Sequence, residues 1–494
     1  MKLSKMVFFS LLISMVLLFS ACAKLDRYKI MEIDVSGNSG RVSYIDLRYV
    51  NPLNQYSKNT RLRIELFDEN YSSWKAVTDF VTGQNVFTTD EYGHMSFSIL
   101  PRKSGVYKFR LINLDNNTVP PLEFSVNIKK STWGFLIWLA ADNDLETYSF
   151  IDLEEIKNQN PDVFVMIMHD KYSSINGNDS LMVLDENGEF VEVQTFNYDV
   201  NSGSEEFLRY VLEQFYSFEF EKSALIIWNH GNGWIDDSKF DFAVSYDFTR
   251  YDALTTKEIR RAIEYVNTRK NKTLDLLGFD ACYMGTLETA YELRNCAKYF
   301  VASAFTEPAF GWNYTFLSVI NSDTSIQDLA ENIVNGYFEF YSWLGYENES
   351  LSLGVYDLSH VTDMAEKIST LSEILIEMIE NEKKLKTDII SEYHHQTLNY
   401  YPEEQIVDPL NFLNVLCENT NYHELQGIEN DILDTLYNEF LVYKKISTTD
   451  FWNIGLGLFL PTDLDSYQEK LNDMSTLDFY NDTSWKNFLE ILVN

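Results

Sequence analysis

Residues 223–234 read Ser-Ala-Leu-Ile-Ile-Trp-Asn-His-Gly-Asn-Gly-Trp, and residues 274–285 read Leu-Asp-Leu-Leu-Gly-Phe-Asp-Ala-Cys-Tyr-Met-Gly. Each stretch is a short apolar run that ends abruptly in small and reactive residues. Runs of this length, fed from helical segments, are typical of buried strands in a parallel sheet. Ligands bind beyond the carboxyl ends of the strands in open α/β sheets, so we expect His230 and Cys282 to lie at one edge of one sheet.

An imidazole beside a thiol suits nucleophilic catalysis. His230 can accept the proton of Cys282, and the thiolate is the nucleophilic form. The backbone N–H groups of Gly231 and Cys282 are the natural donors to an oxyanion, because a glycine lets the chain approach a substrate carbonyl closely. Alone, each side chain is more simply a buried thiol or a hydrogen-bonded imidazole. The two motifs together, about 50 residues apart, favour a catalytic dyad.

Both motifs resemble those of the clostripain family of cysteine peptidases, which belongs to the caspase-like clan. The matching residues are 229–234 and 280–285, with support from 133–144 and from 307–314. The resemblance extends from about residue 130 to the C-terminus. It implies an endopeptidase of α/β class, with a caspase-like, mainly parallel sheet flanked by helices, in which His230 is the base and Cys282 the nucleophile.

The resemblance also indicates a substrate pocket. Asp280 matches an acid associated with binding Arg or Lys before the scissile bond, and a carboxylate suits a guanidinium; the alternative is that Asp280 only orders the cysteine loop. The family pattern Ser-Glu-Glu is here Ser303-Ala304-Phe305, and Phe310 stands where a second pocket acid is usual. We therefore expect a weakened basic preference with an intact dyad.

No cofactor is required for this chemistry. The resemblance allows calcium dependence, although no acidic loop with defined ligand spacing is visible. No CxxC or paired His/Cys spacing suggests a zinc site, so we expect no metal in the catalytic centre. The polar loop 235–255, which contains Lys239 and Arg250, is a candidate for self-cleavage because exposed loops are the usual sites of nicking.

The N-terminus has the pattern of a targeting segment. Lys2 and Lys5 precede an apolar run over residues 6–19, and Phe-Ser-Ala-Cys follows at 19–22. This resembles a bacterial lipoprotein signal, which predicts a signal peptide 1–21, lipidation of Cys22 and a tether 22–29. A plain secretory signal is the alternative. The first reading places the protein in the bacterial cell envelope, anchored to a membrane by lipid and facing the periplasm or the cell exterior.

The spacing of apolar residues changes near residue 130, and this change divides the remaining chain into two regions. Residues 30–129 form short alternating runs separated by turn residues, which predicts a small β-sandwich of immunoglobulin-like type. Residues 130–494 form the peptidase domain: strands alternate with helices, and the chain beyond about residue 325 is a helical elaboration. We expect one helix, residues 283–294, to begin directly after Cys282, where its N-terminus would stabilise a thiolate.

The amino-acid composition excludes some classes of protein and partner. The chain has 494 residues, 45% of them hydrophobic, and a formal net charge of −36, which argues against disorder and against a nucleic-acid partner. Cys296 and Cys417 are expected to be buried thiols. The leading hypothesis is a lipid-anchored cysteine endopeptidase acting on proteins or peptides. The alternatives are a catalytically silent binding or adhesion lipoprotein on a peptidase scaffold, and a peptide ligase using the same dyad.

Overall fold

The computed structural model describes residues 28–494 except 35–36, 173–177, 236–243, 347–348, 421 and 448–452. The chain divides into two compact units, one reaching to Ser131 and including Leu184–Val191, the other formed by Thr132–Val183 and Glu192–Asn494. The predicted signal peptide, Cys22 and most of the tether lie outside the described residues. Among the helices of the described part, none is long and apolar enough to cross a membrane.

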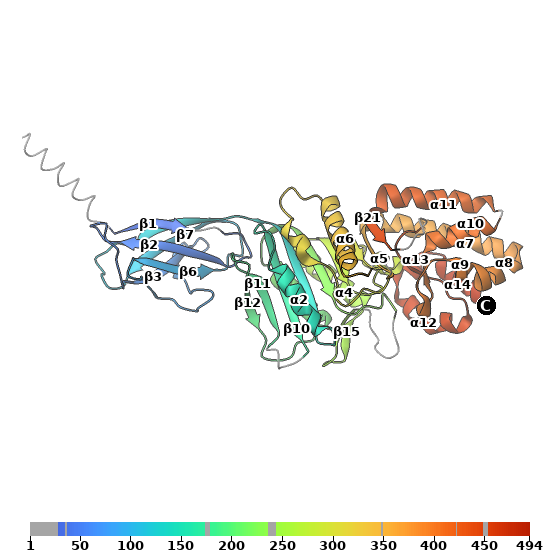
Figure 1. Ribbon diagram of the computed structural model, residues 1–494, viewed down its shortest axis with the longest axis horizontal. Helices are drawn as coiled ribbons and strands as arrows, with labels where there is room; N and C mark the ends of the chain where they lie inside the picture. Colours follow the sequence, from blue (N-terminus) through green and yellow to red (C-terminus); the bar gives the residue numbers. More distant parts are fainter. Residues whose placement is uncertain are drawn as a thin grey trace, which may run out of the picture. The chain divides into compact units, whose positions relative to one another are not determined.

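The first unit is built from two antiparallel sheets (Figure 1). One contains β1 (Lys29–Asp34), β2 (Ser43–Val50) and β6 (His94–Ile99); the other contains β3 (Arg61–Asp68), β4 (Ser73–Ala76), β5 (Phe87–Thr88), β7 (Gly105–Asn113) and β8 (Leu122–Ile128). Alternate side chains of both sheets enter one buried cluster, in which the ring centroids of Phe97 and Phe109 are 5.7 Å apart. The period of two in the sequence follows from this one-sided burial.

A sheet of nine strands forms the centre of the second unit. Its order is β12-β11-β10-β9-β13-β16-β17-β18-β21. The strands are β9 (Ser131–Ala141), β10 (Val163–Lys171), β11 (Ser180–Leu184), β12 (Phe190–Thr195), β13 (Phe220–Trp228), β16 (Leu274–Asp280), β17 (Ala297–Ala302), β18 (Ser352–Asp357) and β21 (Leu441–Ile446). The pairs β10–β9, β13–β16 and β16–β17 are parallel. This confirms the prediction of a mainly parallel sheet.

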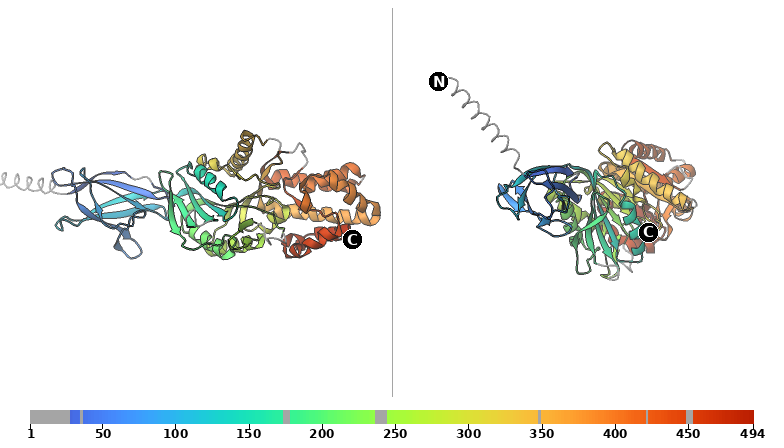
Figure 2. Two further views of the ribbon diagram at one scale, coloured as in Figure 1. Left: turned by 60° about the horizontal axis from the view of Figure 1, so that its bottom comes forward. Right: turned by 60° about the vertical axis from the view of Figure 1, so that its left-hand side comes forward.

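Helices flank this sheet in two groups. The first group contains α2 (Glu146–Ile156), the short η1 (Tyr314–Ser318) and α6 (Ile326–Trp343); the second contains α3 (Glu205–Phe215), α4 (Thr256–Lys270) and α5 (Leu287–Glu292). Within each group the helices contact one another, and the left view of Figure 2 shows the groups on opposite sides of the strands. The central strands are therefore covered on both faces, which explains their continuous apolar runs.

The chain beyond α6 is mostly helical. It contains α7 (Val361–Asn381), α8 (Lys383–Asp388), η3 (Ile389–Tyr393), α9 (His394–Gln396), α10 (Pro409–Asn419), α11 (His423–Thr435), η5 (Leu436–Phe440), α12 (Leu464–Thr476), α13 (Asp478–Asp482) and α14 (Trp485–Val493). A small sheet joins β19 (Asn399–Tyr401), β20 (Ile406–Val407) and β22 (Leu458–Phe459), and a hairpin joins β14 (Val244–Asp247) to β15 (Asp252–Leu254).

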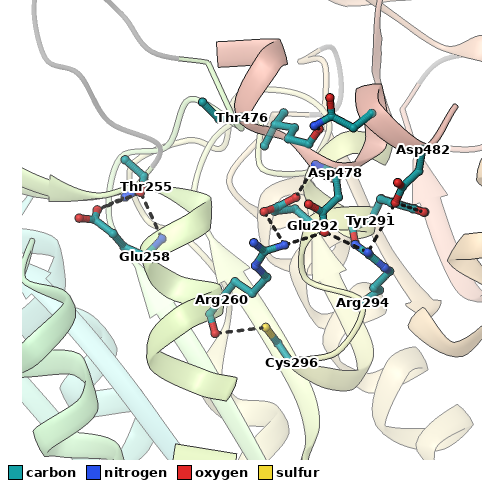
Figure 3. Close-up of polar contacts among 12 residues, drawn as sticks. Thr255, Glu258, Arg260, Tyr291, Glu292, Arg294, Cys296, Thr476, Asp478 and Asp482 are labelled. Atoms are coloured by element: carbon teal, nitrogen blue, oxygen red, sulfur yellow. Dashed lines mark hydrogen bonds and ion pairs between the residues drawn. The ribbon is translucent and has the colours of Figure 1, made fainter. Parts of the chain in front are cut away.

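A polar network links these helices to those beside the sheet (Figure 3). Asp478, at the start of α13, contacts Arg260 of α4 at 2.8 Å and Arg294 at 3.0 Å. Arg260 also contacts the buried carboxylate of Glu292 at 2.8 Å. Bidentate and shared guanidinium–carboxylate contacts fix orientation as well as distance. The helical elaboration thus belongs to the same compact unit as the sheet.

Two local predictions were wrong. The helix after Cys282 begins only at Leu287, where the Thr286 hydroxyl caps it. Tyr283 has φ of 57°, and Gly285 donates its N–H to the Ser303 carbonyl at 2.7 Å, so the chain cannot be helical there. The helix N-terminus therefore gives no support to the thiolate. In addition, Cys417 is only half-buried, whereas Cys296 is buried as expected.

Candidate active site

A cavity of about 110 Å³ lies beyond the carboxyl ends of β13 and β16. Its walls come from the two strand ends, from the start of α2 and from the segment 307–311. The lining residues are Leu145, Trp228, Asn229, His230, Asp280, Ala281, Cys282, Glu307, Pro308, Ala309 and Gly311. His230 and Cys282 therefore line the same cavity, at the edge of the sheet where the sequence led us to expect them.

The pairing of the two strands explains this convergence. Trp228 is the register partner of Asp280, so His230 and Cys282 both lie two residues beyond paired positions of parallel strands. The loops that follow are in close contact: a Cβ on Gly231 would lie 2.4 Å from the Cys282 carbonyl oxygen. A glycine at this position is what lets the histidine loop approach the cysteine loop.

The Cys282 thiol is held by backbone from a third segment. Its Sγ accepts a hydrogen bond from the Glu307 N–H at 3.3 Å. Burial raises the pKa of the thiol, the nearby Asp280 carboxylate raises it further, and the Glu307 N–H opposes both. At neutral pH the thiol therefore keeps its proton, and a base must remove that proton before Cys282 can attack a carbonyl.

His230 is oriented by an acid that was not predicted from the sequence. Its Nε2 lies 2.8 Å from Oδ1 of Asp144, a residue just beyond β9 whose side chain is largely exposed. A carboxylate only accepts hydrogen bonds, so this contact favours a proton on Nε2 and leaves Nδ1 as the basic nitrogen. Next to His230, the Asn229 amide binds the Ala140 carbonyl and accepts the Tyr246 N–H, which fixes the start of the loop.

Asp280 and Glu307 form an acidic pair at the cavity wall, in which Asp280 is buried and Glu307 is partly buried. The Asp280 carboxylate accepts hydrogen bonds from the Trp312 N–H at 3.0 Å and the Tyr314 hydroxyl at 2.9 Å. Burial raises the pKa of Asp280 to about 6, against these donors. Burial, together with the charge of Asp280, raises the pKa of Glu307 well above its usual range. The proximity of Asp280 therefore favours the protonated form of Glu307.

Ser303 and Phe310 are not among the residues that line this cavity. The buried Ser303 hydroxyl donates to the Phe305 carbonyl at 3.0 Å and contacts the Ser352 hydroxyl at 3.1 Å. Phe310 packs edge-on against Tyr148, with ring centroids 5.2 Å apart. Their contact with substrate stays a prediction.

The sequence contained a signal for both residues that were not selected. Asp144 and Glu307 lie in the supporting segments 133–144 and 307–314, each an acid shortly after a strand that ends at this edge of the sheet. In the candidate self-cleavage loop, Arg250 is paired with Asp199, Nε to Oδ2 at 2.6 Å. Lys239 lies outside the described residues.

Residues 137–491 match the sequence profile of the clostripain family. The chain belongs to this family of cysteine peptidases. Clostripain of Hathewaya histolytica is 28% identical over 180 residues, which are 31% of this chain and 34% of that protein. The chain thus matches about a third of the length of this curated relative.

Two solved structures share the fold of this clostripain-family chain. An inactive zymogen C11 protease from Parabacteroides distasonis is 19% identical with a TM-score of 0.54, over 72% of this chain and 98% of that one. A secreted C11 cysteine protease from Bacteroides thetaiotaomicron, in complex with an irreversible peptide inhibitor, is 19% identical with a TM-score of 0.56, over 72% and 99%. At this identity the similarity establishes a common fold.

Proposed function

We propose that this chain is a cysteine endopeptidase in which Cys282 is the nucleophile and His230 the base. The observation that carries the proposal is that both side chains line one cavity at the carboxyl ends of adjacent parallel strands. Membership of the clostripain family supports the reaction class. A peptide inhibitor bound to the Bacteroides thetaiotaomicron relative supports peptides as substrates.

The proposed reaction follows from the groups around the cavity. Nδ1 of His230 takes the proton of the Cys282 thiol as sulfur attacks the scissile carbonyl. The N–H groups of Gly231 and Cys282 donate to the oxyanion. The imidazolium then gives its proton to the leaving amine as the C–N bond breaks, and a water deprotonated by His230 hydrolyses the thioester. The Asp144 carboxylate stabilises the imidazolium, as it accepts from Nε2 throughout.

We further propose that Asp280 and Glu307 weaken, but keep, a preference for Arg or Lys before the scissile bond. The Asp280 oxygens already accept hydrogen bonds from Trp312 and Tyr314, so a guanidinium would compete with two internal donors. A basic side chain is attracted most strongly by an ionised Glu307. Burial disfavours this ionised form, so part of the attraction is lost. Digestion of a peptide library by the purified chain tests this; exclusive cleavage after Arg would contradict it.

Single substitutions test the dyad. Cys282→Ala and His230→Ala should each lower peptidase activity by about 10⁴-fold or more, because the members of such a unit act together. Cys417→Ala and His395→Ala are matched controls, since Cys417 lies outside the cavity wall and His395 is exposed. Normal turnover by folded Cys282→Ala protein would refute the proposal. A thiol-reactive peptide probe separates an enzyme from a silent binding protein, and mass spectrometry of the products separates hydrolysis from ligation.

We also propose that the mature chain begins at lipid-modified Cys22 and that residues 30–129 form an immunoglobulin-like β-sandwich between anchor and enzyme. The order of basic, apolar and small residues before Cys22 supports the anchor. The shared core of two antiparallel sheets supports the sandwich. Cys22→Ser should release the protein from membranes or block its processing. An unmodified mature N-terminus at another residue would exclude the anchor.

A further inference from the structure

A row of aromatic rings leads away from the wall of the catalytic cavity. The residues before and after Phe310 line that cavity, whereas Phe310 itself packs against Tyr148 of α2. On its other side, the Phe310 ring centroid lies 6.0 Å from that of Phe340 in α6, and the Phe340 centroid lies 6.4 Å from that of Trp343. These four residues are called the aromatic ladder below. They form a continuous path from the cavity wall to the end of α6.

The outer end of the ladder is open to solvent. Trp343 is the last residue of α6 and is 80% exposed, the highest value among the large apolar side chains of the described residues. Tyr148, Phe310 and Phe340 are partly exposed. Aromatic side chains carry a large apolar area, and contiguous exposed apolar surface marks places where another molecule binds. The ladder is therefore a candidate binding surface.

A buried tyrosine fastens the ladder to the cavity wall. The hydroxyl of Tyr341, also in α6, lies 2.9 Å from the carbonyl oxygens of both Pro308 and Gly311. The same stretch of chain places the Glu307 N–H 3.3 Å from the Cys282 sulfur. Helix α6 and the thiol are thus held by one segment, and the rings keep a fixed position relative to the nucleophile.

The spacing of the rings matches that of an extended peptide. In an extended chain each residue advances about 3.3 Å, so alternate side chains lie on one face about 6.6 Å apart. The steps from Phe310 to Phe340 and from Phe340 to Trp343, at 6.0 and 6.4 Å, are close to this repeat. When one side chain of a peptide occupies the cavity, the next two on the same face therefore fall on the ladder.

We propose that the aromatic ladder binds apolar or aromatic side chains at the third and fifth residues before the scissile bond of the peptide substrate. This rests on the proposed peptidase function, which places the residue before the scissile bond in the cavity. The ladder begins at the wall of that cavity and so continues the surface on which the peptide lies. Aromatic rings make favourable contacts with apolar and aromatic groups, which gives the ladder its selectivity.

Three peptides that end in arginine coupled to aminomethylcoumarin test the ladder. One has glycine at every other position, one has Phe at the third and fifth positions before the scissile bond, and one has Phe at the second and fourth. Phe at the third and fifth positions should lower KM about 5- to 20-fold with kcat unchanged, because such contacts bind substrate and transition state alike. Phe at the second and fourth positions lies on the opposite face and should have no such effect.

Substitutions show whether the ladder is the source of this preference. The preference is measured as the ratio of kcat/KM for the peptide with Phe at the third and fifth positions to kcat/KM for the all-glycine peptide. Trp343→Ala should lower this ratio about threefold or more, and Trp343→Phe should restore most of it. Phe340→Ala is the second variant. The matched control is Tyr437→Ala, since Tyr437 is 53% exposed and lies in η5, outside the ladder and the cavity lining; it should keep the wild-type ratio.

Peptide binding to a variant without the nucleophile separates the ladder from the chemistry. Folded Cys282→Ala protein should bind the peptide with Phe at the third and fifth positions about 5- to 20-fold more tightly than the all-glycine peptide in isothermal titration. If this difference depends on Trp343 but the wild type cleaves neither peptide, the ladder stands and the peptidase proposal fails.

Equal KM and equal Kd for these two peptides would overturn the ladder proposal, even if the wild type cleaves both. An equal benefit from Phe at the second and fourth positions would overturn it too. So would a wild-type dimer in sedimentation that Trp343→Ala dissociates, because a second copy of the chain would then be the molecule that covers the rings.

Discussion

The contact between Gly231 and the cysteine loop predicts that Gly231→Ala disables the enzyme without unfolding it. The added Cβ would meet the Cys282 carbonyl oxygen at 2.4 Å and the Ala281 Cβ at 3.0 Å. Ordinary contacts of a Cβ begin near 3.4 Å, so the two loops must separate by about 1 Å. Gly231 does not have positive φ, so its backbone accepts alanine and the effect comes from the close approach alone.

A displacement of about 1 Å at reacting groups costs on the order of 10²-fold in rate, or about 2.7 kcal/mol of activation free energy. We expect kcat/KM on a peptide found by library digestion to fall by that factor. Alkylation of Cys282 by iodoacetamide should slow as well, because thiolate formation depends on His230.

Gly336→Ala is the matched control for this experiment. Gly336 lies in α6, and a Cβ there meets no atom within 4 Å. Alanine should therefore leave kcat/KM unchanged and stabilise the helix slightly, by about 0.5–1 kcal/mol. If folded Gly231→Ala protein keeps kcat/KM within threefold of the wild-type value, the two loops are not held as described and the reasoning fails.

Two further predictions concern single carboxyl groups. Asp144→Asn should lower kcat/KM by about 10- to 100-fold, and by more than Asp144→Ala does. The reason is that an amide can donate a hydrogen bond to Nε2 of His230, which favours the unproductive tautomer. Equal effects of the two variants on the pH–rate profile would contradict this. Burial raises the pKa of Glu288 to about 7, although the Phe459 N–H and the Tyr480 hydroxyl donate to it. The folded state then binds more protons than the unfolded state between about pH 4.5 and 7, so the wild type loses on the order of 3 kcal/mol of stability as pH rises through this range. Urea unfolding at pH 5 and pH 8 should show that Glu288→Gln removes this part of the decline, and an unchanged slope would exclude Glu288 as its source.

The position of the cavity could be predicted because it depends on buried parallel strands. The runs before Asn229 and Asp280 are continuously apolar. This pattern is typical of a central strand that is buried on both faces of a sheet. Polar residues at their ends then fall at one edge. Asp144 also follows a strand that ends at this edge, so the same reasoning predicts it as a candidate site residue.

Features that depend on tertiary contacts could not be predicted. The helix after Cys282 looked continuous because local propensity does not show the positive φ of Tyr283 or the bond from Gly285 to Ser303. Strands β18 and β21 pair antiparallel across a long sequence separation, and each is a short run of mixed polarity.

Strand β21 also determines how the sheet ends. The outermost strand of a sheet offers unpaired N–H and C=O groups, which can template the addition of another chain. Here that strand is only six residues long and contains two lysines, of which Lys444 is turned toward Asn453 with Nζ 2.6 Å from the amide oxygen. A strand arriving from a second molecule would have to bury or displace these cations. This edge of the sheet that carries the nucleophile is therefore protected against pairing with a strand of another molecule.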